Sequence, residues 1–488
     1  PTLTISYIGM KPQSVSLASY SGKPLRISLQ LNSAMMDEVV VTGYQEIKKE
    51  KMTGATTTLS AEKLDQRYSA NVLDNLEGRV AGLSTYGGKP IIRGSGTLRG
   101  VASPLLVIDG VPVESTLSGF DPFSNATPSS DAVAGAIADL NPYDIESINV
   151  LKDAAAAAIY GARAANGIIV ITTKNARKKG KIDIDFSANL TVFENRNVDY
   201  GDNFYMNAAQ QVEAEKKYYE YYFFNNNGEV GDPISNTATQ INAGHMGVSP
   251  VKYGYYQLAT GEITRDELDT RLNALKKNNF ARDYADDIYR RQIVQQYNLA
   301  LRSSSDKARH NVTVNYKNDN SGIINHSTDY FNLSYKGSFD LAKWLTATVS
   351  FNGIYSDRKE AGSDLTANFT NIWALPAYTP YYNADGSRRT QYYTYSGNEY
   401  WDGKGQDGFH ELGVIIPDEF RNNTRRTKRN HMRYHADLLF RVIDGLTINT
   451  QFLYEMENHN ASWHANEKSH ASRTIRNAYT VIDDYGDI

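Results

Sequence analysis

The chain has 488 residues, a net charge of −4, 34 tyrosines and no cysteine. Its length exceeds that of one ordinary compact domain and predicts several units or one very large barrel. The absence of cysteine excludes disulfides and thiolate metal sites but leaves the redox compartment open. Nucleic acid is not indicated either, because the basic run Lys174–Lys181 is better explained as a solvated turn.

Apolar runs long enough for a membrane helix, about 18 residues, are absent from the sequence. The longest are Ala154–Ala158 and "GIIVIT". This excludes helical spans only, because each strand of a transmembrane barrel is apolar on one face alone. Abundant tyrosine suits binding surfaces and the headgroup belts of such barrels. The chain begins at Pro1 without a signal peptide and so looks processed or trimmed.

The first 36 residues, with "TLTISYIGM" and "SVSLASYSGKPLRISLQL", predict the end of a small β-sandwich. The segment "MDEVVVTGYQ" follows, in which Val39, Val40, Val41 and Tyr44 favour an extended backbone between polar and chain-breaking neighbours. An isolated strand of low charge is a template for pairing with another chain. We expect it to be offered to a partner and to have no pairing strand within its own chain.

A mixed α/β unit with many glycines begins near Met52 and includes "LNPYDIESINVLKDAAAAAIYGARAANGIIVITTK". Here "ESINVL" predicts a strand, Asp153 a helix N-cap, Gly161 the end of that helix, and "GIIVITT" another strand. A nucleotide-binding fold needs glycines between the first strand and the helix, but the junction is "LKDAA". The sequence therefore argues against a Rossmann unit.

Seven segments in the second half alternate strictly between apolar and polar residues, which predicts half-buried β-strands. Their apolar positions carry no charge and fall within 182–192, 297–301, 312–316, 331–341, 345–355, 432–442 and 446–456. The opposite positions include charged side chains, namely Asp183, Asp185, Arg302, Lys336, Asp340, Arg433, Asp437 and Arg441. Alternation alone is also compatible with a soluble sandwich or barrel.

Three features favour a membrane barrel with a water-filled lumen. The strands reach the nine to eleven residues of a membrane-crossing strand, and their polar face is charged. The joins "SSSDKAR", "AKW" and "IDG" are short, whereas the alternate joins are long, as expected for periplasmic turns and extracellular loops. Aromatic residues gather toward the long-loop end as a girdle would: Tyr316, Phe331, Tyr355, Tyr434 and Tyr454.

Such a barrel would be incomplete in this sequence. The chain stops at "VIDDYGDI", in what looks like an eighth strand. A barrel of about eight strands has an interior just filled by side chains and leaves no room for a globular plug. We therefore expect this chain to be the N-terminal part of a longer barrel, either truncated or continued by a separate chain.

The runs "DEVVVTGY", "GRVAGL", "IRG", "PLLVIDGVP" and "DIESINVLKDAAAAAIYGARAANGIIVITTK" resemble the SusC/RagA family of TonB-dependent outer-membrane transporters. The resemblance implies a mainly β protein with a plugged barrel of about 22 strands, of which this chain holds about eight. It implies four parts: the end of a carboxypeptidase-regulatory-like sandwich (1–36), a TonB box and linker (37–48), an α/β plug (49–178) and barrel strands with long extracellular loops (179–488).

Site residues follow from the same resemblance. The TonB box comprises Asp37, Glu38, Val39, Val40, Val41, Thr42, Gly43 and Tyr44. Its extended segment would add a strand to the sheet edge of TonB, with main-chain bonds giving affinity. The structural residues expected in the plug are Arg93, Gly94, Asp109, Gly110, Asp153, Gly161, Arg163 and Gly167. Gly161 and Gly167 would serve the backbone conformation, and Arg163 would pair inside the plug or to the barrel wall.

The function implied is active import of a large nutrient across the bacterial outer membrane, driven by TonB with ExbB and ExbD. A passive porin or surface adhesin would need neither plug nor TonB box. An enzyme is not expected: no histidine pair has metal-ligand spacing, and we expect no catalytic residue, metal or cofactor.

The family also implies a SusD-like lipoprotein lid, for which loops 193–292 and 357–430 are the candidate docking surface. The cargo is predicted to be an oligosaccharide, because aromatic rings stack on sugars and the loop 374–401 is rich in tyrosine. The candidate contacts are Tyr378, Tyr381, Tyr382, Tyr392, Tyr393 and Trp401. A peptide cargo of the RagA type is the alternative, since peptides use the same rings. Outer-membrane lipid would surround the barrel.

Overall fold

The computed structural model describes residues 248–362, 375–392 and 410–479 without a gap, and 182–198, 204–225 and 231–242 before them. In the first 180 residues it describes 2–5, 13–16, 39–41, 46–48, 56–61, 76–86, 89–94, 103–113, 142–152 and 164–175. Positions 27, 72, 140, 160–161, 180 and 372–373 complete the set.

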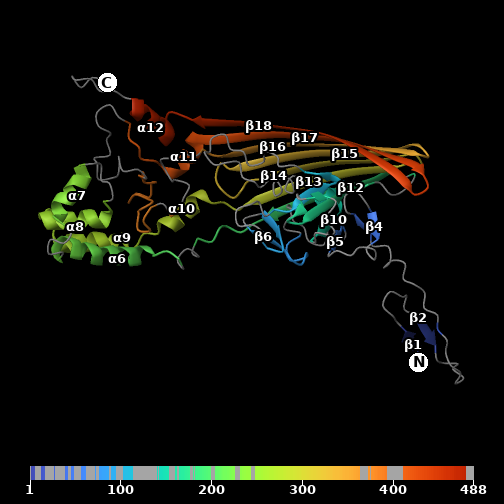
Figure 1. The fold of residues 1–488 in the computed structure, drawn as a ribbon. Helices are drawn as coiled ribbons and strands as arrows, with labels where there is room; N and C mark the ends of the chain where they lie inside the picture. Colours follow the sequence, from blue (N-terminus) through green and yellow to red (C-terminus); the bar gives the residue numbers. More distant parts are fainter. Residues whose placement is uncertain are drawn as a thin grey trace.

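A long antiparallel sheet, here called the wall sheet, dominates the molecule (Figure 1). Its seven strands follow one another in chain order: β12 (Ile182–Val192), β13 (Ile293–Ser304), β14 (Ala308–Asp319), β15 (Ser327–Ala342), β16 (Leu345–Ala361), β17 (Asn423–Ile443) and β18 (Leu446–Ala465). The seven predicted strands are confirmed. Short turns join them at one end of the sheet, the turn end, and long connections at the other, the loop end.

The register of the wall sheet brings the predicted apolar positions into line. One row of neighbours crosses all seven strands: Phe186, Leu299, Val314, Leu333, Gly353, Met432 and Met456. Because side chains alternate along each strand, one face of the sheet is apolar and the other polar. We call these the outer and inner faces.

The last four strands are longer than predicted, with 16, 17, 21 and 20 residues. They reach the nine to eleven residues of a membrane-crossing strand, as predicted, and continue beyond them. β17 begins at Asn423, and its first residues, "NTRRTKRNH", are polar on both faces. They pair with Ile354–Ala361 of β16 through the main chain, which produces no hydrophobic alternation.

The plug sheet lies against the inner face of the wall sheet (Figure 1). Its strands stand in the order β5 (Thr56–Ser60), β10 (Ile145–Leu151), β11 (Ile168–Thr173), β8 (Leu105–Ile108) and β9 (Val111–Pro112). β11 and β8 are parallel and the other pairs antiparallel. The strands predicted from "ESINVL" and "GIIVITT" are therefore confirmed.

β11 packs apolar side chains on both of its faces, as a central strand of a covered sheet does. Ile169 and Ile171 join a core with Leu106 and Ile148, whereas Ile168 and Val170 join a second core with Leu105, Val107 and Tyr160. The helix predicted from Asp153 falls on residues 153–159, which lie outside the described residues.

Three small hairpins accompany the plug sheet: β1 (Thr2–Ile5) with β2 (Gln13–Ser16), β3 (Val39–Val41) with β4 (Glu46–Lys48), and β6 (Leu83–Tyr86) with β7 (Lys89–Ile92). The second corrects an expectation, because the strand Val39–Val41 does have a pairing strand in its own chain. The connection of four residues is short enough for the chain to fold back. Within the described residues this hairpin is a two-stranded sheet, so the other edge of β3 stays open.

The long connection 193–292 folds into helices beyond the loop end: α6 (Ala208–Glu220), η5 (Tyr221–Asn225), α7 (Pro233–Asn242), α8 (Pro250–Thr260), α9 (Arg265–Leu275) and α10 (Phe280–Ile288). Capping boxes at Asn207 and Thr264 fix the starts of α6 and α9. Val212, Val251, Tyr255 and Leu268 form their common core. Two further helices, α11 (Ile416–Asn422) and α12 (His470–Tyr479), flank β17 and β18. None of the helices in the described part of the chain is long and apolar enough to cross a membrane.

Candidate functional site

The turn between β8 and β9 places a carboxylate against the wall sheet. Asp109 and Gly110 have φ of 48° and 86°, the positive values that a two-residue type I′ turn requires. An Asp-Gly pair adopts them readily, which is the physical reason for this pair in "PLLVIDGVP".

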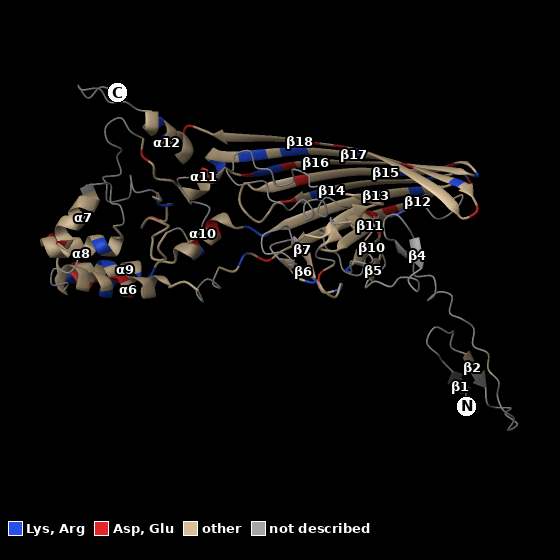
Figure 2. Cartoon of the chain, in the orientation of Figure 1, with Lys and Arg blue, Asp and Glu red and all other residues tan. Residues whose placement is uncertain are grey.

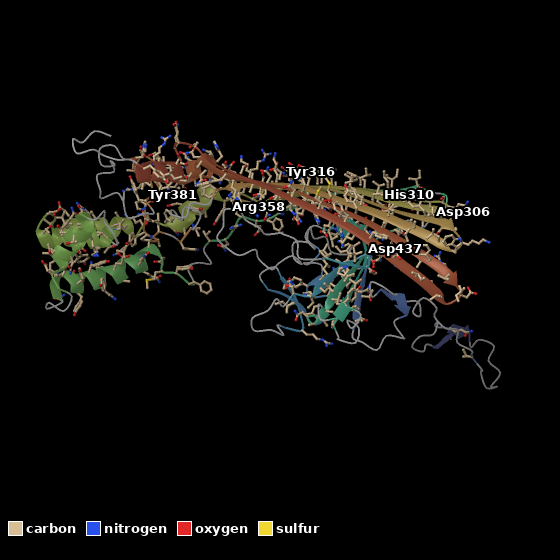
Figure 3. All side chains as sticks on the ribbon, turned by 45° about the horizontal axis from the view of Figure 1, so that its top comes forward. Asp306, His310, Tyr316, Arg358, Tyr381 and Asp437 are labelled. Carbon is tan, nitrogen blue, oxygen red and sulfur yellow. The ribbon has the colours of Figure 1, made fainter. Side chains whose placement is uncertain are left out.

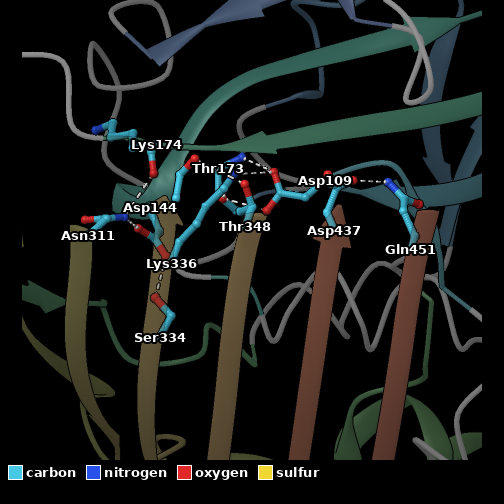
Figure 4. A network of polar contacts seen from close by, with 11 residues as sticks. Asp109, Asp144, Thr173, Lys174, Asn311, Ser334, Lys336, Thr348, Asp437 and Gln451 are labelled. Carbon is cyan, nitrogen blue, oxygen red and sulfur yellow. Dashed lines mark hydrogen bonds and ion pairs between the residues drawn. The ribbon is translucent and has the colours of Figure 1, made fainter. Parts of the chain in front are cut away.

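Asp109 joins the plug to the wall (Figure 4). Its Oδ1 lies 3.1 Å from Nζ of Lys336 on β15, and it also accepts from the Thr173 amide at 3.0 Å. The Thr173 hydroxyl donates to Oδ2 at 2.7 Å. Burial by itself raises the pKa of Asp109, but Lys336 and the bonds from Thr173 outweigh it and hold the pKa below its usual value. The carboxylate is therefore charged at neutral pH.

Asp144 makes a second contact between the plug and the wall, which the sequence analysis did not predict. This residue ends the short helix η2 (Pro142–Asp144) directly before β10. Its Oδ1 accepts from Asn311 Nδ2 at 3.1 Å and from the Thr313 hydroxyl at 2.9 Å, and its Oδ2 accepts from the Ser334 hydroxyl at 2.6 Å. The three donors come from β14 and β15 (Figure 4). The available signal was an acidic residue immediately before a buried strand.

A cavity of mixed lining lies between the Asp109 turn and the inner face, where polar side chains such as Asn332, Arg433 and His435 stand beside apolar ones such as Val111 and Ile145. The Asn332 side-chain amide, Arg433 Nη2 and His435 Nε2 are buried and have no hydrogen-bond partner among the described residues. The plug therefore meets the wall through the polar contacts of Asp109 and Asp144, beside a cavity that also has apolar lining.

Several predicted plug residues hold special backbone conformations. Arg93 and Gly94 have φ of 57° and 83°, and Gly161 has φ of 62°. Gly167 has φ of 87°, and a Cβ there would lie 2.9 Å from Ile92 Cδ1. The backbone role predicted for Gly161 and Gly167 agrees with these angles. Asp153 and Arg163 lie outside the described residues.

Only the middle of the predicted TonB box is described. Val39, Val40 and Val41 form β3, as expected of an extended segment. The other members of the predicted box lie outside the described residues: Asp37, Glu38, Thr42, Gly43 and Tyr44.

Two of the predicted substrate contacts are core residues. Tyr378 is 0% exposed and its hydroxyl donates to Glu215 at 2.9 Å, while Tyr381 is 2% exposed and donates to Asp287 at 2.9 Å. Burial and the neighbouring carboxylate raise the pKa of each hydroxyl. Neither ring can stack on a ligand in this arrangement, so the expectation that they contact substrate is corrected.

Arg388 binds the same carboxylate as Tyr381. Its Nε and Nη2 lie 2.5 Å and 2.7 Å from the two oxygens of Asp287. Tyr381 lies beyond the loop end, at the opposite end of the strands from the Asp306 turn (Figure 3). The sequence analysis missed Glu215, Asp287 and Arg388 as its partners. They come from separate segments, so no local motif indicated them.

The remaining candidates differ in their exposure. Tyr382 is 39% exposed and packs edge-on against Tyr381, with ring centroids 4.9 Å apart. Tyr392 donates its hydroxyl to Glu411. Tyr393 and Trp401 lie outside the described residues. A stacked pair that was not anticipated, Tyr205 and Trp373, lies at 4.6 Å.

A plug-like mixed sheet against the inner face of a seven-stranded antiparallel wall, with an apolar outer face, is the arrangement of part of a plugged membrane β-barrel. Residues 48–168 match the TonB-dependent receptor plug domain. The TonB-dependent receptor SusC of Bacteroides thetaiotaomicron is 33% identical over 197 residues, 39% of this chain and 18% of that protein. The TonB-dependent receptor P39 of Formosa agariphila is 30% identical over 363 residues, 72% of this chain and 28% of that protein.

The RagAB peptide importer in its open-open state shares the fold, with a TM-score of 0.60 and 20% identity, covering 87% of this chain and 43% of that one. The chain belongs to the TonB-dependent receptors. These receptors are β-barrels of the bacterial outer membrane and are not enzymes. The chain spans less than a third of the length of these two curated relatives.

Proposed function

We propose that this protein takes part in TonB-dependent active import of a large nutrient across the outer membrane. The observation that carries the proposal is the position of the segment 39–48 beside an edge strand of the plug. β5 follows this segment and, among the strands that the structure describes, pairs with β10 alone at the edge of the plug sheet. TonB would add a strand at the open edge of β3, through main-chain bonds.

A pull on residues 37–44 would reach β5 before any other strand of the plug sheet. β8 and β10 are attached to the wall near Asp109 and Asp144, so they resist the same force. β5 would therefore separate from β10 while the rest of the sheet stays in place. We infer a passage for cargo from this movement.

The proposal includes a complete barrel that is wide enough to enclose the plug. The described wall lies against a plug that a barrel of about eight strands has no room to enclose. The plugged class has about 22 strands, which supports a complete barrel of that size. The same proposal divides the chain into a sandwich remnant (1–36), a TonB box with linker (37–48), a plug (49–178) and barrel strands with loops (179–488).

The cargo we propose is an oligosaccharide. The exposed ring of Tyr382 and the Tyr205–Trp373 pair near the loop end support sugar stacking, whereas Tyr378 and Tyr381 no longer do. A peptide is the second candidate, because the fold is shared with the RagAB peptide importer. Mass spectrometry of the ligand that copurifies with the protein separates the two. Short peptides without oligosaccharide would replace the first candidate by the second.

A lipoprotein lid of the SusD type is the extracellular partner we propose. Exposed apolar side chains on the helical connection support a docking surface: Phe204, Tyr205, Met206, Tyr218, Tyr221 and Phe224. Aromatic residues and methionine are enriched at protein interfaces. Affinity purification of the tagged barrel tests the pairing, and a lid that never accompanies it would exclude this partner.

Deletion of residues 37–44 tests the import function. Uptake should be abolished, while surface expression and substrate binding stay unchanged. A sharper pair is Val40→Pro against Val40→Ala. Proline removes a main-chain donor from the strand and should block coupling, whereas alanine keeps it and should not. Growth of the deletion strain on the transported nutrient at the wild-type rate would refute the coupling role.

A further inference from the structure

The cavity between the Asp109 turn and the wall sheet lies at the middle of the wall strands. Asn332 and Arg433 border it, and each is next in sequence to a member of the central apolar row, Leu333 or Met432. The cavity volume is about 90 Å³, which is the space taken by about three water molecules in the liquid. One edge of a sugar ring, with its hydroxyl groups, needs a space of this order.

The wall side of this cavity presents polar groups that lack hydrogen bonds. Asn332 is 1% exposed, and neither its Oδ1 nor its Nδ2 has a partner among the described residues. Arg433 Nη2 and His435 Nε2 are buried, and the described part of the chain offers them none either. Buried polar groups without partners are costly and are rarely kept in folded proteins. Three of them at one cavity indicate a bound molecule that supplies the partners.

The plug side of the same cavity is lined by apolar side chains. Val111, Val113 and Ile145 border it, and each is at most 9% exposed. A fitting ligand therefore carries hydrogen-bonding groups on one side and apolar surface on the other. A sugar ring has this form, because its hydroxyl groups lie around the edge and its C–H bonds on the faces. Small-molecule sites generally combine apolar lining with a few polar groups that fix the orientation of the ligand.

The fixed charges around the cavity argue against an acidic ligand. They belong to Lys336, Arg433, Asp109, Asp144 and Glu455. Lys336 is paired with Asp109 at 3.1 Å, which leaves one cation for the other two carboxylates. His431 and His435 add positive charge only when they are protonated. A uronate or sulfate group would thus be repelled, whereas a hydroxyl group donates and accepts without carrying charge.

The cavity has a polar approach from the loop end and a movable element beside it. On the inner face, polar side chains continue along β17 and β18 toward the loop end, where Arg429 has Glu457 at 2.5 Å. Figure 2 shows Lys and Arg gathered on β17 toward α11. On the plug side, Leu59 of β5 packs in the same core as Val113 and Ile145. Withdrawal of β5 would therefore open this core beside the cavity.

We propose that this cavity is a transit site, which binds one uncharged sugar unit of the cargo as the cargo passes the plug. Asn332 bonds two hydroxyl groups, because its amide both donates and accepts. Arg433 and His435 bond a neighbouring hydroxyl group, and the plug side covers the apolar face of the ring. The transit site rests on the proposed import and deepens it, since it assigns a neutral oligosaccharide as cargo.

Uptake by cells that carry the full-length transporter tests the class of cargo. The probes are neutral hexasaccharides of glucose, xylose and mannose, with hexagalacturonate as the acidic one. At least one neutral sugar should enter, and hexagalacturonate should enter much more slowly. Faster entry of hexagalacturonate would overturn the transit site and leave import intact. Failure of every sugar to enter would instead refute the oligosaccharide cargo of the proposed function.

An introduced cysteine tests the position of the site. Asn332→Cys should react with a membrane-impermeant thiol reagent when TonB is energised, and the transported neutral sugar should slow this reaction several-fold. Ser338→Cys is the matched control, because Ser338 is 4% exposed on the same face of β15 but does not border the cavity. Its reaction should not depend on the sugar. His435→Cys serves the same purpose if Asn332→Cys folds poorly.

Asn332→Leu tests the hydrogen bonds of the site. Leucine has a similar size but no bonding atoms, so uptake of the neutral sugar should fall several-fold while its equilibrium binding at the cell surface stays unchanged. Unchanged uptake, or an equal fall of uptake and binding, would overturn the proposal. Absence of protection at Asn332→Cys, or equal protection at Ser338→Cys, would do so as well, because the cavity would then hold water only.

Discussion

Thr58 on β5 donates its hydroxyl hydrogen to Asn149 Oδ1 on β10 at 2.7 Å. The two residues are direct neighbours across the strands, so their side chains lie on the same face at the edge of the plug sheet. This is the junction that we expect to open when the TonB box is pulled.

A disulfide across this junction should block transport. The chain has no cysteine, so Thr58→Cys with Asn149→Cys would introduce the only thiols in it. Neighbouring positions of antiparallel strands have Cβ atoms about 4.5–5.5 Å apart, close enough for bridging with a small adjustment. Uptake should stop under oxidising conditions and return with a reductant. Each single cysteine variant should transport in both conditions, and unimpeded uptake by the bridged protein would exclude separation of β5 from β10.

Lys336→Met should loosen the Asp109 turn. It leaves a charged carboxylate without its cation, which costs about 1–3 kcal/mol. Hydrogen–deuterium exchange in residues 105–113 should then be faster by about tenfold or more, because 1.4 kcal/mol corresponds to a factor of ten. Lys343→Met, in the turn between β15 and β16, is a control that should leave this segment unchanged.

The Asp109 contact should also weaken in acid. Its pKa is lower in the folded protein than in the unfolded chain, where an aspartate titrates at about 3.9. The stabilisation is therefore complete above the unfolded pKa and is lost as pH falls through the folded value. Relative to the intrinsic exchange rate at each pH, the protection of residues 105–113 should fall on acidification in the wild type, and this fall should be smaller in Asp109→Asn.

Gly167→Ala should reduce the yield of folded protein more than Gly161→Ala does. Both glycines have positive φ, so alanine at either position carries a backbone strain of about 1–3 kcal/mol. At Gly167 the added Cβ would also lie 3.0 Å from the carbonyl oxygen of Leu151, whereas at Gly161 no atom of the described residues lies within 4 Å. Thermal unfolding of both variants measures the difference. Equal losses would mean that the close contact with Ile92 and Leu151 relaxes freely.

Tyr381→Phe should destabilise the long connections beyond the loop end without changing cargo affinity. It removes a buried hydrogen bond to a charged acceptor, worth about 1–3 kcal/mol. Tyr382→Ala is the matched variant. It removes an exposed ring, so affinity should fall while stability changes less. Equilibrium binding of the copurified ligand and thermal unfolding separate the two effects, and a large affinity loss in Tyr381→Phe would restore it as a ligand contact.

Local sequence determined the strand pattern of this protein. Apolar residues recur at every second position along each wall strand, and Phe186, Leu299 and Val314 are examples. Burial of one face of the sheet against lipid requires only that period. The apolar run at Ile168 was readable for the same reason, since it depends on its immediate neighbours.

Only the tertiary structure decided contacts between distant segments. Asp144 meets Thr313 across 169 positions, and Tyr381 meets Asp287 across 94, with no periodicity to connect them. The polar start of β17 is a strand because β16 supplies main-chain partners, not because its side chains alternate. Burial likewise separated Tyr381 from Tyr382, which are adjacent in the sequence and chemically identical, because exposure depends on what the rest of the chain packs against each ring.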